Sequence, residues 1–159
     1  MSNSKKIAAS LLGQNLSEQE CDLLSDIVTT RTLQAGEMLF DEGTQDNLLS
    51  ILITGKLEVL KVLPGGNTFS MDFLKEGTMA GELAFIDGLP HTMRVIAKKD
   101  SDVLMLHREA FEAYIESQPM LTYQVMRAIL RYSFSLQNKI NAKYLEMYRM
   151  VQNQYTAHY

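Results

Sequence analysis

The residues that decide the fold are 74–92, which read LKEGTMAGELAFIDGLPHT. Glycines at positions 77 and 81 interrupt this largely apolar stretch, and a third glycine follows at position 88. Glycine reaches positive φ without steric cost, so glycines beside apolar runs are typical of strand ends and tight turns. The spacing predicts a strand that ends at Leu74 and a sharply turning connection after it.

The same glycine pattern extends toward the N-terminus. Gly36 and Gly43 enclose one apolar run, and Gly55 separates two others. The segment 64–67 reads Pro-Gly-Gly-Asn, which predicts a hairpin turn. Short β-rich runs between such turns favour a sandwich or barrel. The predicted strands are Thr32–Gln34, Met38–Glu42, Leu48–Thr54, Leu57–Val62, Thr68–Leu74, Met93–Ala97 and Val103–His107.

Helical patterns flank these strands. Ser17, followed three residues later by Glu20, has the pattern of a capping box and predicts a helix start. After Arg108 the chain reads as helical to its end, and the stretch from Met120 to Tyr155 contains neither proline nor glycine. We therefore expect one domain over residues 1–159, with N-terminal helices over 1–30, a β block over 31–107 and C-terminal helices over 108–159.

Apolar residues recur every three or four positions along the last predicted helix, as in a helix that packs along another helix. They are Val125, Ile129, Tyr132, Leu136, Ile140, Tyr144, Met147 and Val151. A helix of about 36 residues spans roughly 54 Å at 1.5 Å per residue, which exceeds a domain of this size. The stripe either folds back onto the β block or pairs in parallel with a second copy. We favour the pairing, because only an oligomer buries so long a stripe.

Composition excludes several classes of protein. The chain has 159 residues, a net charge of −4 and a single cysteine, so we expect no internal disulfide, cysteine zinc site or iron–sulfur cluster. No apolar run is long enough to cross a membrane and no secretory signal opens the chain, so we expect a cytoplasmic protein. Residues 119–159 carry five basic groups and one acidic group, which fits either an anionic partner or a solvated helix face.

The glycine series resembles a known family. Five glycines fall in the family's order, and Gly-Glu-Leu-Ala follows at 81–84; the glycines are Gly36, Gly43, Gly55, Gly77 and Gly81. The chain is similar, over about residues 15–155, to the cyclic-nucleotide-binding domain of cAMP-receptor-type bacterial regulators, cyclic-nucleotide-dependent kinases and gated channels. The resemblance implies a mainly β fold, a jelly roll with N-terminal helices and a long C-terminal dimer helix. Because the chain ends at Tyr159, we expect a stand-alone domain without a helix-turn-helix or direct DNA binding.

The resemblance also implies a ligand site. Residues 81–85 would form the family's phosphate-binding cassette, a short helix whose free N–H groups and partial positive charge suit a phosphate. Glu82 resembles the glutamate that accepts a hydrogen bond from the ribose 2′-hydroxyl; taken alone, it is equally an acid in the first turn of a helix. The residues expected to contact the ligand are Gly81, Glu82, Leu83, Ala84, Pro90, His91, Thr92, Leu136 and Gln137.

One position departs from the family. Nine residues after the glutamate, most nucleotide-binding members carry an arginine that pairs with the cyclic phosphate, and this chain has His91. A guanidinium binds phosphate through two parallel N–H bonds, whereas histidine is mostly neutral at pH 7 and then offers one donor. The loss of one bond to a charged group, about 1.5–3 kcal/mol, weakens binding by roughly 10- to 150-fold. Arg94 lies at an odd offset from His91, so in a regular strand it faces away from the pocket.

The sequence therefore predicts a dimeric regulatory module, with no cofactor, that binds cAMP or cGMP and signals through its C-terminal helix to an unidentified protein partner. The alternative is a degenerate domain that binds no cyclic nucleotide and serves in assembly or protein contact, which His91 favours. An enzyme is not expected, because His91, His107 and His158 lack metal-site spacing and no nucleophile motif appears. A haem sensor with His91 or His107 as its single ligand stays open.

Overall fold

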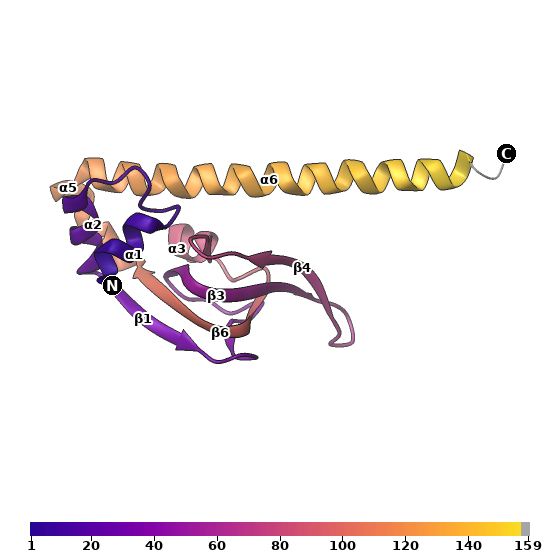
Figure 1. Ribbon diagram of the computed structural model, residues 1–159, viewed down its shortest axis with the longest axis horizontal. Helices are drawn as coiled ribbons and strands as arrows, with labels where there is room; N and C mark the ends of the chain where they lie inside the picture. Colours follow the sequence, from indigo (N-terminus) through magenta and orange to yellow (C-terminus); the bar gives the residue numbers. More distant parts are fainter. Residues whose placement is uncertain (157–159) are drawn as a thin grey trace.

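A computed structural model describes residues 1–156, and positions 157–159, His158 among them, lie outside the described residues. A rolled antiparallel sheet lies beneath helices, and the last helix runs far past the sheet (Figure 1). The helices are α1 (Asn3–Ala9), α2 (Glu18–Ser25), α3 (Glu82–Asp87), α4 (Arg108–Glu112), α5 (Tyr114–Ser117) and α6 (Pro119–Thr156). The strands are β1 (Val28–Leu33), β2 (Met38–Phe40), β3 (Leu48–Val62), β4 (Thr68–Leu74), β5 (Met79–Ala80) and β6 (Arg94–His107).

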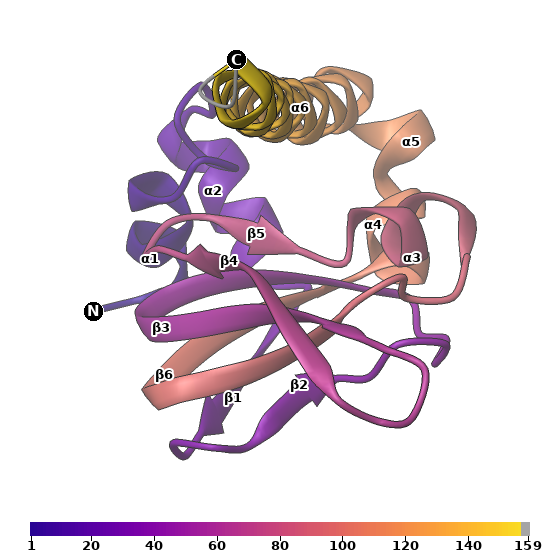
Figure 2. The same ribbon diagram turned by 90° about the vertical axis from the view of Figure 1, so that its right-hand side faces the viewer.

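The sheet is organised around two long strands, β3 and β6. Strand order is β1-β6-β3-β4, with β2 paired to β6 and β5 paired to β3, and every pairing is antiparallel. The predicted fold, a jelly roll of this family's type with helices at both ends of the chain, is confirmed. Figure 2 shows α6 nearly end-on, with α1 and α2 on one side, α3 to α5 on the other and the rolled sheet below.

Several predicted strands merge in the structure. The pair Leu48–Thr54 and Leu57–Val62 forms the single strand β3, and Gly55 lies inside it at a shift of register with β6. A Cβ on Gly55 would lie 2.1 Å from the Ser101 Oγ, and its φ is +109°, so this glycine permits a close crossing of β6 rather than a turn. In the same way, Met93–Ala97 and Val103–His107 become parts of β6.

Other boundaries shift by a few residues. Strand β1 begins at Val28, so the N-terminal helices end at Ser25 and not at residue 30. Pro119 opens α6 and does not close the preceding helix, because the first position of a helix needs no N–H donor. The capping box is confirmed: the Ser17 hydroxyl accepts from the Glu20 N–H at 3.2 Å, and the Glu20 carboxylate accepts from the Ser17 N–H at 2.8 Å.

Two apolar cores hold the domain together. One lies between the N-terminal helices, α6 and one side of the sheet, and includes Ile7, Leu24 and Val125. The other lies within the roll and includes Leu57 and Val103. Helix α6 therefore belongs to the core of its own domain, which connects it mechanically to the sheet.

Helix α6 is 38 residues long and changes character halfway. Its buried residues all lie in the first half and are Leu121, Thr122, Val125, Ala128, Ile129 and Tyr132. From Gln137 to Thr156 every residue is exposed. The predicted stripe thus divides: its first half folds back onto the domain, whereas Ile140, Tyr144, Met147 and Val151 lie in the overhang (Figure 1). Within residues 1–156, no helix combines the length and apolar character needed to cross a bilayer.

Candidate ligand site

The short helix expected at residues 81–85 is present as α3. Gly81 precedes it with φ of +87°, and a Cβ there would lie 2.9 Å from the Leu48 carbonyl oxygen. Glycine is therefore required for two reasons, the left-handed backbone and the close approach to the start of β3. Gly88 ends the helix, where its N–H donates to the Ala84 carbonyl at 2.9 Å. Glycines at both ends of α3 therefore fix the backbone of this helix against its surroundings.

Glu82 occupies the first turn of α3 and is half-buried. Burial raises the pKa of its carboxyl, although its own N–H and nearby His91 act in the opposite direction. Burial also raises the pKa of Tyr132, on α6, to about 12, and the charge of Glu82 adds to this shift. Tyr132 is buried in the same apolar core as Phe85, the α3 residue three positions after Glu82. Sequence reasoning placed Tyr132 only in the apolar stripe of the helix.

His91 is buried at the start of α3. The residue as a whole is 6% exposed, and its ring stacks on Phe40 with centroids 3.7 Å apart and an interplanar angle of 8°. Its Cε1 lies 3.5 Å from the position that a Cβ on Gly81 would take. Its Nε2 lies 2.8 Å from the Asp46 Oδ2. The predicted neighbours His91 and Gly81 are thus brought together, whereas Phe40 and Asp46 were not foreseen.

The backbone of this region is held in place by two loops. The Gly43 N–H donates to the His91 carbonyl at 2.7 Å, and the His91 N–H donates to the Thr44 carbonyl at 2.9 Å. The Gln45 side-chain amide donates to the Gly88 carbonyl at 3.2 Å. The segment 43–46 is therefore bonded to the segment 88–91, and the position of His91 is set by both.

Two basic groups near this loop, Arg94 and Lys61, are paired with carboxylates. The Arg94 guanidinium donates to both Asp41 oxygens, at 2.8 and 3.1 Å, and lowers the pKa of that carboxyl. Lys61 forms an ion pair with Glu42, and this hydrogen bond lowers the pKa of Glu42. Arg94 is therefore occupied by Asp41, and its guanidinium does not substitute for the family's arginine in this structure.

The remaining predicted site residues differ in exposure. Ala84 is buried, Leu83 is half exposed, and Pro90 and Thr92 are exposed. The Thr92 carbonyl accepts from the Lys61 ammonium at 3.2 Å. On α6, Leu136 packs partly against the core of the helical layer and Gln137 is exposed.

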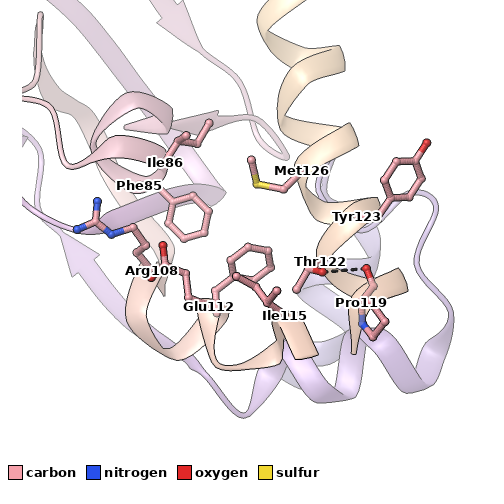
Figure 3. Close-up of a pocket in the computed structure, with 10 residues that line it drawn as sticks. Phe85, Ile86, Arg108, Glu112, Ile115, Pro119, Thr122, Tyr123 and Met126 are labelled. Carbon is pink, nitrogen blue, oxygen red and sulfur yellow. Dashed lines mark hydrogen bonds between the residues drawn. The ribbon is translucent and has the colours of Figure 1, made fainter. Parts of the chain in front are cut away.

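A separate cavity of about 420 Å³ lies between α3 and the helices α4 to α6. Figure 3 shows Phe85 and Ile86 on α3 and Met126 and Tyr123 on α6 around it. At its edge the Arg108 guanidinium donates to the Asn47 side-chain oxygen at 2.9 Å. None of the predicted ligand contacts lines this cavity, which is mostly apolar.

His91 and His107 each contact a protein group through Nε2. The His107 Nε2 lies 3.2 Å from the Thr29 hydroxyl, and the His91 Nε2 is bonded to Asp46. Residues 1–156 contain no group of three histidine, cysteine or acidic side chains placed to hold a metal ion. The Nε2 atoms of both histidines therefore have protein partners.

A short helix that opens at the edge of a rolled antiparallel sheet, together with a packed C-terminal helix, defines a β-roll module flanked by helices. The family model for the cyclic nucleotide-binding domain matches residues 30–118, and the chain belongs to this family. The family is generally non-catalytic.

Relatives support the same assignment. The chain is 25% identical over 120 residues to the cyclic AMP receptor protein of Thermus thermophilus, with 76% of this chain and 56% of that protein covered. It is 26% identical over 96 residues to a CRP-like cAMP-activated global transcriptional regulator of Mycobacterium tuberculosis, with 60% and 43% covered. The chain thus spans about half the length of the curated relatives it matches.

Solved structures agree on the fold. A cyclic nucleotide-binding domain from Methylobacillus flagellatus superposes with a TM-score of 0.82 at 20% identity, covering 89% of this chain and 82% of that one. The catabolite activator protein of Thermus thermophilus superposes with a TM-score of 0.70 at 22% identity, covering 84% and 62%. At such identities the likeness concerns the fold alone.

Proposed function

We propose that this chain is a dimeric regulatory module that binds a cyclic nucleotide, such as cAMP or cGMP, beside α3 and signals through α6. The observation that carries the proposal is the packing of α3 with α6 in one apolar core, where Phe85 of α3 and Tyr132 of α6 are both buried; this core joins the helix expected to contact the ligand to the helix expected to transmit the signal. Relatives described as cAMP-activated or as cAMP receptors support the ligand class. We take residues 1–159 as one domain, with no cofactor.

A ligand would act through the contact between α3 and α6. The phosphate would lie beside the N–H groups that open α3, near Leu83 and Ala84, and the ribose would bond to Glu82. Tyr132 is buried in the same core as Phe85 of α3, so a nucleotide that moves α3 would change the packing of α6. A ligand shifts a conformational equilibrium only by its difference in affinity for the two states, and this contact supplies such a difference.

The dimer would form along the exposed face of α6. Tyr123, Leu130, Tyr144 and Val151 recur at multiples of seven residues and are exposed by 48–68%. Such a stripe is typical of a helix that pairs with another helix, and exposed apolar surface of this extent marks an interaction site. We place this dimer in the cytoplasm, with an unidentified protein as the recipient of its signal and without direct DNA contact by the domain.

A second candidate is an assembly module that binds no cyclic nucleotide. The observation that favours it is the hydrogen bond from the His91 ring to Asp46, since the residue in the family's arginine position is already paired within the protein. Dimerisation through α6 would then be the function itself.

Calorimetric titration of the purified protein with cAMP, cGMP and cyclic dinucleotides tests the first candidate. We expect binding of one of these ligands that Glu82→Ala weakens by about tenfold or more, the loss expected for a hydrogen bond to a charged group. Glu116→Ala, at an acid on α5, is the matched control and leaves binding unchanged. Heat-silent titrations, confirmed by equilibrium dialysis, would favour the assembly module.

A further inference from the structure

The His91 ring fills the space next to the first residue of the cassette. It stacks on Phe40 at 3.7 Å, and the edges of both rings lie beside Gly81: the His91 Cε1 is 3.5 Å and the Phe40 Cε1 is 3.7 Å from the position of a Cβ there. Its side chain is only 3% exposed. A phosphate at the start of α3 would therefore contact this ring. The contact is favourable only if a ring nitrogen donates a hydrogen bond to the phosphate.

Asp46 determines which nitrogen of the His91 ring donates a hydrogen bond. A carboxylate only accepts hydrogen bonds, so the His91 Nε2 at 2.8 Å is the donor. In the neutral ring the other nitrogen, Nδ1, then carries a lone pair, and a phosphate oxygen finds an acceptor where it needs a donor. In the imidazolium form Nδ1 donates, but the charge of the Asp46 carboxylate offsets that of the ring.

The pair is also held firmly in place. The second Asp46 oxygen, Oδ1, accepts from the Leu48 N–H at 3.1 Å, which orients the carboxylate. The backbone of His91 is bonded on both sides to residues 43 and 44. Arg94 and Lys61 are each bonded to a carboxylate of their own, so neither supplies a free charge to the same place.

We infer that Asp46 sets the anion affinity of the cassette site by holding the His91 ring as its own hydrogen-bond partner. An anion at the start of α3 and the Asp46 carboxylate compete for one imidazole. This inference rests on the proposed function in taking the ligand to be anionic, and it names the residue that governs how strongly such a ligand binds.

The direct test uses inorganic phosphate as the probe. Nitrogen-15 NMR of the histidine rings, with the His91 signals assigned from a His91→Gln variant, is followed during phosphate titration. For Asp46→Asn we expect a His91 response at a phosphate concentration at least about tenfold lower than in the wild type, since a hydrogen bond to a charged group is involved. Asparagine keeps an oxygen for the Leu48 N–H, so the loop retains its bond.

Two further variants keep the result interpretable. Asp102→Asn removes one carboxylate from β6 where it bonds Thr32 and Thr54, and it controls for net charge. Asp46→Ala removes the partner altogether and should shift the phosphate response in the same direction as Asp46→Asn. An unchanged His91 response in both Asp46 variants, or an equal change in Asp102→Asn, overturns the inference.

Nucleotide titrations separate this inference from the proposed function. We expect Asp46→Asn to bind cAMP or cGMP about 10- to 150-fold more tightly than the wild type. We also expect His91→Arg to gain less than the double variant Asp46→Asn/His91→Arg, because Asp46 captures the new guanidinium. A phosphate response without nucleotide binding supports the role of Asp46 and refutes the nucleotide. Nucleotide binding that Asp46→Asn leaves unchanged supports the nucleotide and refutes the role of Asp46.

Discussion

The two halves of α6 share one spacing of apolar residues but have different surroundings. In the first half Ile129 is 2% exposed and packs with the N-terminal helices and the sheet, whereas in the second half Ile140 is 64% exposed. Both residues belong to the same periodic stripe, and the helix continues between them without interruption. A stripe of this kind shows that a helix has a partner, but it does not say whether the partner is the same chain.

At the boundary between the halves, α6 is bonded to strand β4 of the sheet. Lys139 donates to both oxygens of Asp72 on β4, at 2.8 Å each. Beyond it the helix extends past the sheet (Figure 1). The first half is therefore stabilised by burial, and the second half by helix continuity and, in the proposed dimer, by a second copy. Four predictions follow this division, from the largest effect to the smallest.

The largest contrast is expected between the two isoleucines. Ile129→Ala leaves a cavity in the core and should lower the free energy of unfolding by about 2–5 kcal/mol. Ile140→Ala, at low protein concentration, should change it by no more than about 0.5 kcal/mol. Denaturant unfolding followed by circular dichroism measures both. Equal losses would mean that the overhang is buried in the monomer, and the distinction between the halves would fail.

A second contrast concerns association. Tyr144→Asp introduces a charge into the exposed stripe and should raise the dissociation constant of the dimer by at least about tenfold. Met150→Asp lies about 120° away around the helix and is exposed, so it is the matched control. Sedimentation equilibrium gives both constants. A monomeric wild type at concentrations where weak dimers form would contradict the proposed dimer.

The third prediction concerns the boundary itself. Burial raises the pKa of Asp72, but the hydrogen bonds from Lys139 and the Phe73 N–H outweigh it, so the pKa is lowered. A lowered pKa stabilises the fold above the usual carboxyl range and loses this effect as pH falls through the folded value. Lys139→Met should therefore cost about 0.2–1 kcal/mol at pH 7, because the pair is partly exposed, and less in acid. Urea unfolding at several pH values measures the difference.

The smallest effect is expected at the contact between the first half and the cassette. The pKa of Glu82 is raised by burial, so its ionised form costs stability once pH rises above the usual glutamate range. Glu82→Gln should raise Tm slightly at pH 7, and the gain should vanish in acid. Glu58→Gln is the control with the opposite sign, because Lys98 and Ser70 lower the pKa of Glu58. A drop in Tm for Glu82→Gln at pH 7 would contradict the buried-acid interpretation.

Local signals explain which elements were predictable. The capping box and strand β4 occur where the sequence predicts them, because each depends on residues that are close together in the sequence. The turn predicted at Gly55 is absent, because Gly55 lies inside strand β3. A glycine between two apolar runs is typical of a turn, but here Ser101 passes within contact distance of it from the opposite strand. The contact that requires the glycine is 46 residues away in the chain, and no local pattern contains it.

The sequence by itself determined the family, the short helix after Gly81, the departure at His91 and the approximate extent of the last helix. These properties depend on residue type and spacing along the chain. Only the tertiary structure decided that Asp46 bonds the His91 ring, that Asp41 pairs with Arg94 and that Tyr132 of α6 shares a buried core with Phe85 of α3. The physical reason is that hydrogen bonds and ion pairs depend on distances of a few ångströms between loops and helices, which spacing along the chain does not specify.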